Sequence, residues 1–399
     1  MSDTPSYYRT FYTLSGLAIL SPLAIDGFLP ALNSAAVGLN TDVGQIMVAL
    51  GILTVGSGFA QLIHGPLSDR YGRKPVIVIG LLLYILSAGM SAFVVNVEQL
   101  FVLRFFQGIA VASTMIIMRS VVRDLFGVKE GAKLFANLFM VLAIMPLIGP
   151  IIAGHLTVWF GWQAVFFLMA GTGVIVLLVI IFFLEESLQA KDMRAMTPSV
   201  LAVSFAEIIT DRTFVTFLLI GMGAYSGLYA ILAGIAPVMT GVLGQSADVF
   251  GYQFAAIMTG HLIAAAFAGK IVERLGVKKI ILLGTIFSII GGLMLLGLTL
   301  MGITTIYSIL IPIAIHLAGF ALTMPAMTAG ALSNFRHMAG RATSLLGFLQ
   351  QGTGALVTIT LGLTADGTQM PMVFALAGAS VFAFLAFVIL IPRTTLKTD

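Results

Sequence analysis

Four ionisable side chains interrupt long apolar stretches of this sequence: Asp26, Arg104, His261 and His316. An ionisable group inside hydrocarbon is costly and usually marks a site that binds an ion or a ligand. Burial favours a neutral carboxylic acid, whereas a nearby cation favours the charged carboxylate. We therefore predict that Asp26 takes up and releases a proton, and that the approach of Arg104 controls this exchange.

An alternative for Asp26 and Arg104 is a permanent ion pair that fastens two helices together. At a rise of about 1.5 Å per helical residue, Asp26 lies about 25 Å beyond Arg9, and Arg104 lies about 22 Å beyond Arg119. The two opposite charges therefore fall at a similar depth, and both interpretations remain open at this point.

The two histidines are weaker candidates for a functional role. His316 can face a cavity or form a hydrogen bond between helices, and His261 fits core packing best. Two membrane histidines without a nearby acid do not form a metal site, and no catalytic triad or phosphate-binding loop is evident. We therefore expect no metal, no cofactor and no enzymatic activity, so that energy must come from an ion or substrate gradient.

The elements that must position these groups are membrane-spanning helices. Of the 399 residues, 59% are hydrophobic and 9% are charged, and the mean hydropathy is +1.09. Soluble domains have roughly 25% charged residues, so this composition excludes a soluble enzyme, a nucleic-acid binder and a disordered chain. A spanning helix needs about 20 mainly apolar residues. Such stretches predict twelve spans, at 10–32, 43–64, 75–95, 98–118, 134–157, 163–184, 214–238, 250–268, 279–300, 305–331, 342–363 and 371–391.

A polar stretch divides the predicted spans into two sets of six. We predict an N-terminal six-helix bundle at 1–184, a cytoplasmic linker at 185–212 and a C-terminal six-helix bundle at 213–399. Every Lys and Arg except Arg104 then falls on the linker's side of the membrane. Positive loops stay in the cytoplasm, so both termini are predicted inside. The net charge of +4 thus indicates topology, and no nucleic-acid partner is expected.

An internal repeat supports this division. GPLSDRYGRK at 65–74 recurs as GKIVERLGVK at 269–278, and GFLPAL at 27–32 has a counterpart in GIAPVM at 234–239. Two repeats with a site between them are typical of transporters. The predicted fold class is an all-α membrane protein of two pseudo-symmetric six-helix bundles.

Four motifs in this span order together resemble those of the major facilitator superfamily. They are PLAIDGFLPAL at 22–32, GPLSDRYGRKPVI at 65–77, LRFFQGIAVA at 103–112 and MPLIGPIIAG at 145–154. The first is similar to the acid-bearing motif of the twelve-helix drug:proton antiporters. SNFRHMAGRATSLLGFLQQ at 333–351 adds similarity to the bicyclomycin/chloramphenicol-resistance (Bcr/CflA) branch. The resemblance covers essentially the whole chain.

The resemblance implies roles for two further sets of residues. In the family, glycines permit a tight first loop, whose acid and Arg pair with an acid at the inner end of span 4 and lock the outward-facing state. The matching gating residues here are Gly65, Asp69, Gly72, Arg73, Lys74 and Asp124. The antiporter branch uses a glycine–proline motif in span 5 to seal leaks, matched here by Gly149, Pro150 and Gly154. Small-residue helix packing would explain Gly154 equally well.

The expected function is proton-coupled export of small organic compounds across the cell inner membrane, by a monomer that works by alternating access in the lipid bilayer. Since Asp26 is the only acid deep in a span, neutral, zwitterionic or monocationic substrates are expected rather than dications. Residues predicted to line the cavity, or otherwise to pack in the core, are Phe28, Gln107, Tyr225, Tyr229, His316, Phe320 and Gln351. The alternatives are a proton-coupled nutrient or metabolite carrier of the same fold and a non-transporting receptor or scaffold.

Overall fold

The computed structural model describes residues 7–192, 197–335 and 338–391, and within these ranges it contains helices and no strands. The helices are α1 (Tyr7–Ile25), η1 (Asp26–Ala31), α2 (Leu32–Gly38), α3 (Val43–Tyr71), α4 (Arg73–Ser91), α5 (Val97–Leu125), α6 (Val128–Phe160), α7 (Gln163–Phe183), α8 (Pro198–Thr210), α9 (Arg212–Ala236), η2 (Pro237–Val242), α10 (Ala247–Leu300), α11 (Ile306–Leu332), α12 (Ala339–Leu363) and α13 (Met370–Leu390).

The helices account for the twelve predicted spans. Eleven stretches in the described ranges are long and apolar enough to cross a bilayer. One of them, α10, has 54 residues and is interrupted at Gly276, where φ is 77°. Gly276 lies 204 positions after Gly72, which has a φ of 111° at the end of α3. Since both glycines end a helix with a backbone that other residues rarely adopt, the break in α10 separates the eighth and ninth spans.

Polar side chains fix where several spans begin. Asp42 accepts a hydrogen bond from the backbone N–H of Gln45 at the start of α3, and Asn96 does the same for α5. Thr305 forms a reciprocal capping box at the start of α11. Such caps satisfy N–H groups that have no partner within the helix. These polar caps and glycine turns lie between long apolar segments and therefore set the helix lengths.

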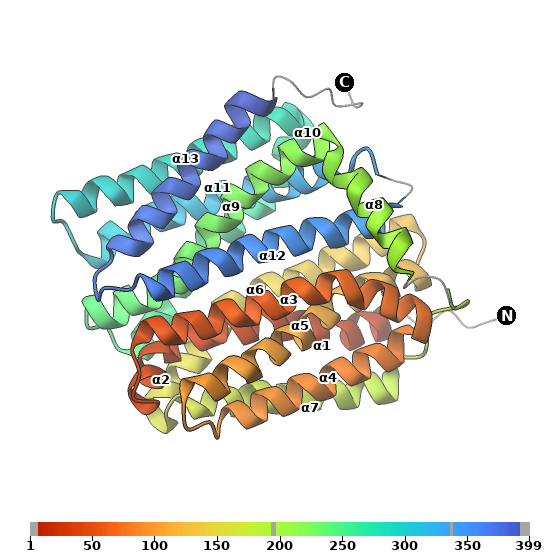
Figure 1. The fold of residues 1–399 in the computed structure, drawn as a ribbon, viewed down its shortest axis with the longest axis horizontal. Helices are drawn as coiled ribbons and strands as arrows, with labels where there is room; N and C mark the ends of the chain where they lie inside the picture. The colour runs from red at the N-terminus through yellow and green to blue at the C-terminus, as the bar shows by residue number, and fades with distance from the viewer. Residues whose placement is uncertain (1–6, 193–196, 336–337, 392–399) are drawn as a thin grey trace.

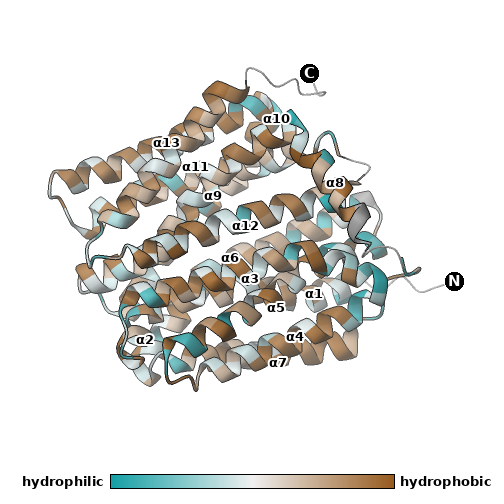
Figure 2. Ribbon diagram, viewed as in Figure 1, coloured by the Kyte–Doolittle hydropathy of each residue, from teal (hydrophilic) through white to brown (hydrophobic). Residues whose placement is uncertain are grey.

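The spans form two groups that lie side by side (Figure 1). The N-terminal group contains α1–α7 with η1, and the C-terminal group contains α9–α13 with η2. The groups meet along two close helix pairs, α3 with α12 and α6 with α10. Helix α1 begins, and α13 ends, at the end of the molecule that carries α8. We call this the α8 end. Hydrophilic residues gather there and in the loops at the opposite end, with apolar helix surface between (Figure 2).

The first helix of each group changes its winding part-way along. In the N-terminal group, η1 is a 3₁₀ helix over Asp26–Ala31 that contains Pro30. In the C-terminal group, η2 is a π-helix over Pro237–Val242. These segments overlap the two copies of the shorter sequence repeat, at 27–32 and 234–239. Short 3₁₀ or π segments inside a long helix often mark hinges or functional sites, and η1 also contacts α9 and α10 across the junction.

Candidate functional site

Asp26 is the first residue of η1 and is 8% exposed. Among the described residues, none forms an ion pair with its carboxylate. The carboxylate lies within electrostatic range of Tyr229 of α9, in the other group. The change to 3₁₀ winding therefore places a buried carboxylate at the junction of the two groups, where it faces no cation.

Arg104 lies on α5 and is fully buried. Its Nη1 donates to the backbone carbonyl of Ala24 at 3.0 Å and to Oε1 of Gln107 at 2.8 Å. Its Nε and Nη2 have no hydrogen-bond partner among the described residues. Arg104 therefore binds the last turn of α1 before the break at Asp26, and the permanent Asp26–Arg104 ion pair considered above is not formed in this conformation.

Aromatic rings surround the Arg104 guanidinium. Its central carbon lies 4.0 Å from the ring centroid of Phe28 and 5.0 Å from that of Phe166 on α7. Cation–π contacts of this kind stabilise a desolvated arginine. Gln107 also contacts α7, through a hydrogen bond of 3.5 Å to the sulfur of Met169. Phe28 and Gln107 are both fully buried, so the structure places these two expected cavity residues in the core around Arg104.

Four other expected cavity residues converge at the junction. The rings of Tyr225 and Tyr229 stack with centroids 6.0 Å apart, and Phe320 lies 5.8 Å from Tyr225. Tyr229 donates a hydrogen bond of 2.7 Å to Oε1 of Gln351 on α12. Gln351 in turn donates a hydrogen bond of 3.3 Å to Ser57 of α3, and this bond joins the two groups. We call Tyr225, Tyr229, Phe320 and Gln351 the tyrosine cluster.

His316 lies apart from this cluster. It is fully buried among helices of the C-terminal group, with Nδ1 at 3.1 Å from the Ser380 hydroxyl and 3.3 Å from the carbonyl of Ser288. His261 is closer to the junction, since its ring lies 5.9 Å from that of Phe320. The contacts of His316 are those of a hydrogen bond between helices, the alternative considered for it above.

The expected gating residues form a charged cluster at the α8 end. Arg73 is 2% exposed and donates to Asp124 at 2.8 Å and to Ser68 at 2.6 Å. It also pairs with Asp69, which lies in the last turn of α3, across the turn at Gly72. The cluster therefore joins the ends of α3, α4 and α5. Each of these partners belongs to the N-terminal group, so the cluster does not by itself connect the two groups.

The linker completes this cluster, which sequence reasoning did not foresee. Glu186 accepts hydrogen bonds from the backbone N–H groups of Arg73 and Lys74, at 2.9 and 3.1 Å, and so caps α4. The Lys74 ammonium donates to the carbonyl of Ile181 at 2.9 Å, near the end of α7. A carboxylate at a helix N-terminus and a cation at a C-terminus both complement the helix dipole.

The expected role of Gly65 in the turn is wrong. Helix α3 continues to Tyr71, so Gly65 lies inside the helix, seven residues before the actual turn. Of the two glycines expected in the turn, Gly72 alone has a positive φ, of 111°. A side chain at Gly72 would collide with the carboxylate of Glu186. The predicted end of span 2 at residue 64 was too early because polar residues can continue a helix beyond the hydrocarbon.

Glycines close the junction at the end opposite α8. Gly154 of α6 packs directly on the backbone of Ala247 in α10, and Gly251 packs on the carbonyl of Pro150. Gly44 of α3 and Gly362 of α12 face each other in the same way. We call Gly44, Gly154, Gly251 and Gly362 the glycine seam. Gly149, by contrast, lies near Leu23 and Met145 in its own group.

One side-chain bond crosses the junction near the seam. Asn33 of α2 donates to the hydroxyl of Thr240 in η2 at 2.7 Å. A cavity of about 260 Å³ lies beside it, lined by both groups, including Met47 and Gly241. The conformation described here is therefore closed at the end opposite α8, while the charged cluster around Arg73 is intact.

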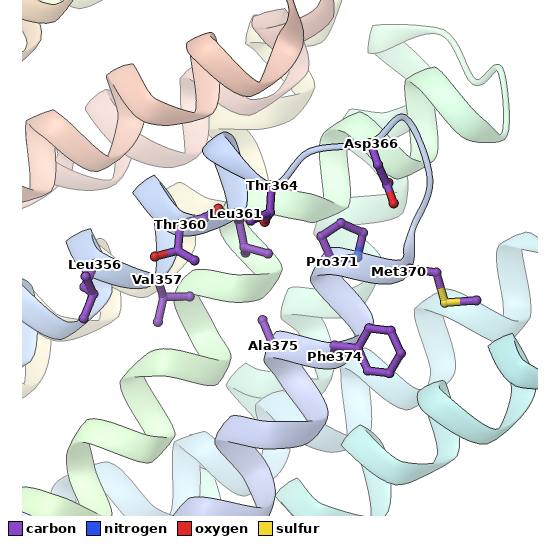
Figure 3. A pocket seen from close by; sticks show the side chains of 10 residues that line it. All are labelled: Leu356, Val357, Thr360, Leu361, Thr364, Asp366, Met370, Pro371, Phe374 and Ala375. Carbon is purple, nitrogen blue, oxygen red and sulfur yellow. Dashed lines mark hydrogen bonds between the residues drawn. The ribbon is translucent and has the colours of Figure 1, made fainter.

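A separate cavity of about 480 Å³ lies between α12, the following loop and α13 (Figure 3). Its walls are mostly apolar, and Asp366 stands at its rim in the loop. The hydroxyl and backbone N–H of Thr368 donate to Asp366 and hold the pKa of that carboxyl below its usual range. None of the expected site residues lines this cavity, and the described ranges contain no group of three or more acids and histidines that could hold a metal.

Comparison with known proteins agrees with this architecture. Residues 14–358 match the family described as the Major Facilitator Superfamily. The chain belongs to this superfamily. The resemblance found in the sequence motifs is therefore confirmed, and the chain is a multi-pass membrane transporter rather than an enzyme.

The relatives cover nearly the whole chain. It is 25% identical over 397 residues to a "Bicyclomycin resistance protein homolog" of Haemophilus influenzae, covering 98% of each chain. It is 27% identical over 372 residues to a "Chloramphenicol resistance protein" of Pseudomonas aeruginosa, covering 92% of this chain and 87% of the relative. The solved structure of a D-xylose-proton symporter has a TM-score of 0.76 at 17% identity, covering 98% of each chain. At that identity the likeness shows the shared major facilitator fold alone.

Proposed function

We propose that this transporter exports small neutral, zwitterionic or monocationic organic compounds in exchange for protons. The relatives named for bicyclomycin and chloramphenicol resistance support drug efflux. In this proposal the protein is a monomer in the cell inner membrane, with the α8 end and both termini in the cytoplasm, because Lys and Arg are retained on that side.

Alternating access would follow from movement of the two groups about their junction. We assign 1–184 and 213–399 to the two moving bundles and 185–212 to the linker. Substrate would bind between the bundles at the tyrosine cluster, since Tyr225 and Phe320 keep partial exposure there. The conformation closed at the glycine seam would then be one in which the site is cut off from the outside.

The observation that carries proton coupling is the position of Asp26. Its carboxylate is buried, lies where the backbone winding changes, and interacts across the junction with Tyr229 rather than with Arg104. A carboxylate held by an arginine would stay charged, whereas one without a cation can exchange a proton as its surroundings change. One pH unit across the membrane supplies about 1.4 kcal/mol per proton.

Replacement of the carboxylate tests this assignment. We expect Asp26→Asn to abolish pH-driven export, measured as uptake into inverted vesicles or efflux from right-side-out vesicles, while Asp26→Glu retains part of it because it can still ionise. Asp366→Asn, at an exposed loop acid, is the matched control and should export normally. Full pH-driven efflux by correctly inserted Asp26→Asn would refute Asp26 as the coupling site.

A further inference from the structure

Arg119 occupies a position that its place in the sequence did not suggest. Arg119 directly follows the predicted end of span 4 at residue 118, among basic residues expected on the cytoplasmic side. Helix α5, however, continues to Leu125, so Arg119 lies within the helix. Its side chain is exposed and interacts electrostatically with Tyr225 of α9, in the opposite group. Arg119 therefore faces the junction and not only the cytoplasm.

No carboxylate in the described part of the chain pairs with Arg119. Arg123, one turn further along α5, lies 3.8 Å from Asp124, and Arg73 takes the other oxygen of that acid. The acid nearest to Arg119 in the sequence, Asp124, is thus already engaged by other arginines. A guanidinium without an acidic partner, at the edge of a transport pathway, can bind an anionic group of a ligand.

The tyrosine cluster connects this cation with the acid of η1. Tyr225 interacts with Arg119, and Tyr229 interacts with Asp26. The two tyrosine rings stack at 6.0 Å with an angle of 23° between their planes, so that they lie one after the other along one side of α9. Four residues of helix correspond to about 6 Å of rise. A cation, two aromatic rings and a carboxylate therefore follow one another along the junction.

We propose that Arg119 binds the carboxylate of zwitterionic aromatic substrates. The guanidinium donates paired N–H groups to the substrate carboxylate, the substrate ring packs on the partly exposed rings of Tyr225 and Phe320, and the substrate ammonium points toward Asp26. This inference rests on the proposed export function and narrows its substrate class. It selects zwitterions from the wider range of neutral, zwitterionic and monocationic compounds.

The test uses a pair of compounds that differ only at the carboxylate. Norfloxacin carries a carboxylate and an ammonium, and its carboxamide keeps the ring and the ammonium. Binding to the purified full-length protein in nanodiscs and efflux from cells lacking their own exporters are measured for both. We expect Arg119→Gln to weaken norfloxacin binding and efflux at least about tenfold and to leave the carboxamide within about twofold. Arg119→Lys should restore part of the loss, because it keeps the charge but not the paired donors.

Lys129→Gln is the matched control, because it removes an exposed cation at the α8 end without altering the junction. Equal losses for acid and amide in Arg119→Gln would show that Arg119 has only a structural role, and no loss for either would show that it does not touch substrate. Both results overturn the inference. Export of the carboxamide but not of norfloxacin by the wild-type protein would overturn it as well. Failure of the wild type to export or bind any compound of either kind would instead overturn the proposed function.

Discussion

Two buried arginines of the N-terminal group are stabilised in different ways. Arg73 is surrounded by two carboxylates and a hydroxyl. Arg104 has a carbonyl, an amide and two aromatic faces, and no acid. Acidic partners fix the charge of Arg73 permanently. Arg104 itself binds the last turn of α1 through the carbonyl of Ala24. It does not neutralise the carboxylate of Asp26, so its contribution is to position α1.

At the residue scale, the Arg73–Asp124 pair should be a stability determinant. Removing one partner of a buried ion pair costs about 3–5 kcal/mol, because the other charge is left uncompensated. We therefore expect Arg73→Gln and Asp124→Asn each to lower the free energy of unfolding in detergent strongly, and the double variant to lose less than the sum. Arg9→Gln is the control, since the Arg9–Glu185 pair is 42% and 70% exposed and such pairs contribute about 1 kcal/mol or less. Strictly additive losses would show that the pair is not coupled.

At the scale of elements, apolar length predicted the twelve spans, but not how the helices continue beyond the hydrocarbon. The predicted ends at 64 and 118 fall short of the observed ends of α3 and α5, at Tyr71 and Leu125. Hydropathy predicts which residues lie in the hydrocarbon. It does not predict where a helix ends, because polar residues also form helix outside the membrane. Arg119 follows the predicted span 4 and still lies within α5, because the helix continues to Leu125.

The winding of the first span was also only partly predictable. Pro22 lies inside α1 and Pro30 inside η1, and a proline removes a backbone hydrogen bond and bends a helix. The switch to a 3₁₀ helix at Asp26 depends on contacts of η1 with α6, α9 and α10, which join segments far apart in the chain. No local pattern contains that information.

The close approach of α6 and α10 depends on Gly154, and its removal is the prediction at this scale. A Cβ at this position would overlap the carbonyl oxygen of Ala247, so we expect Gly154→Ala to hold the two helices apart. A cysteine placed at Met47, beside the 260 Å³ cavity, should then react several times faster with a membrane-impermeant maleimide. The chain has no native cysteine to interfere.

Gly171→Ala provides the comparison, because an added Cβ there meets no atom within 4 Å. It should leave the labelling rate unchanged. Labelling of the Gly154→Ala protein at the rate of the Gly171→Ala protein would contradict a sealing role for Gly154.

At the scale of the whole molecule, the sequence repeat predicted two groups of helices but not which residues meet between them. Phe28 and Gln107 were expected in the cavity, yet they pack around Arg104, whereas Tyr225, Tyr229, Phe320 and Gln351 do converge. In a nearly all-apolar helix, the faces toward lipid, core and cavity differ little in composition. Periodicity therefore cannot assign them, and only the packing of distant helices can.

If the two groups move against each other, a covalent link across the closed end should stop transport. Asn33 and Thr240 are in direct contact at 2.7 Å, so we expect Asn33→Cys/Thr240→Cys to form a disulfide under mild oxidation. The oxidised double variant should lose export, and reduction by dithiothreitol should restore export. The two single variants, treated in the same way, show the effect of oxidation alone. Undiminished export by fully cross-linked protein would exclude opening at this end as part of the cycle.

The glycine seam has a genetic consequence. Gly44, Gly154, Gly251 and Gly362 each touch backbone atoms of the opposite group, with no side chain between. Every missense change at a glycine codon adds at least one carbon atom, and close-packed interiors do not absorb it without displacement. Substitutions in the tyrosine cluster can alter which compounds fit, so that part of the gene can diversify under selection. Missense changes at the four seam codons should therefore be removed by selection, whereas synonymous changes leave the seam intact.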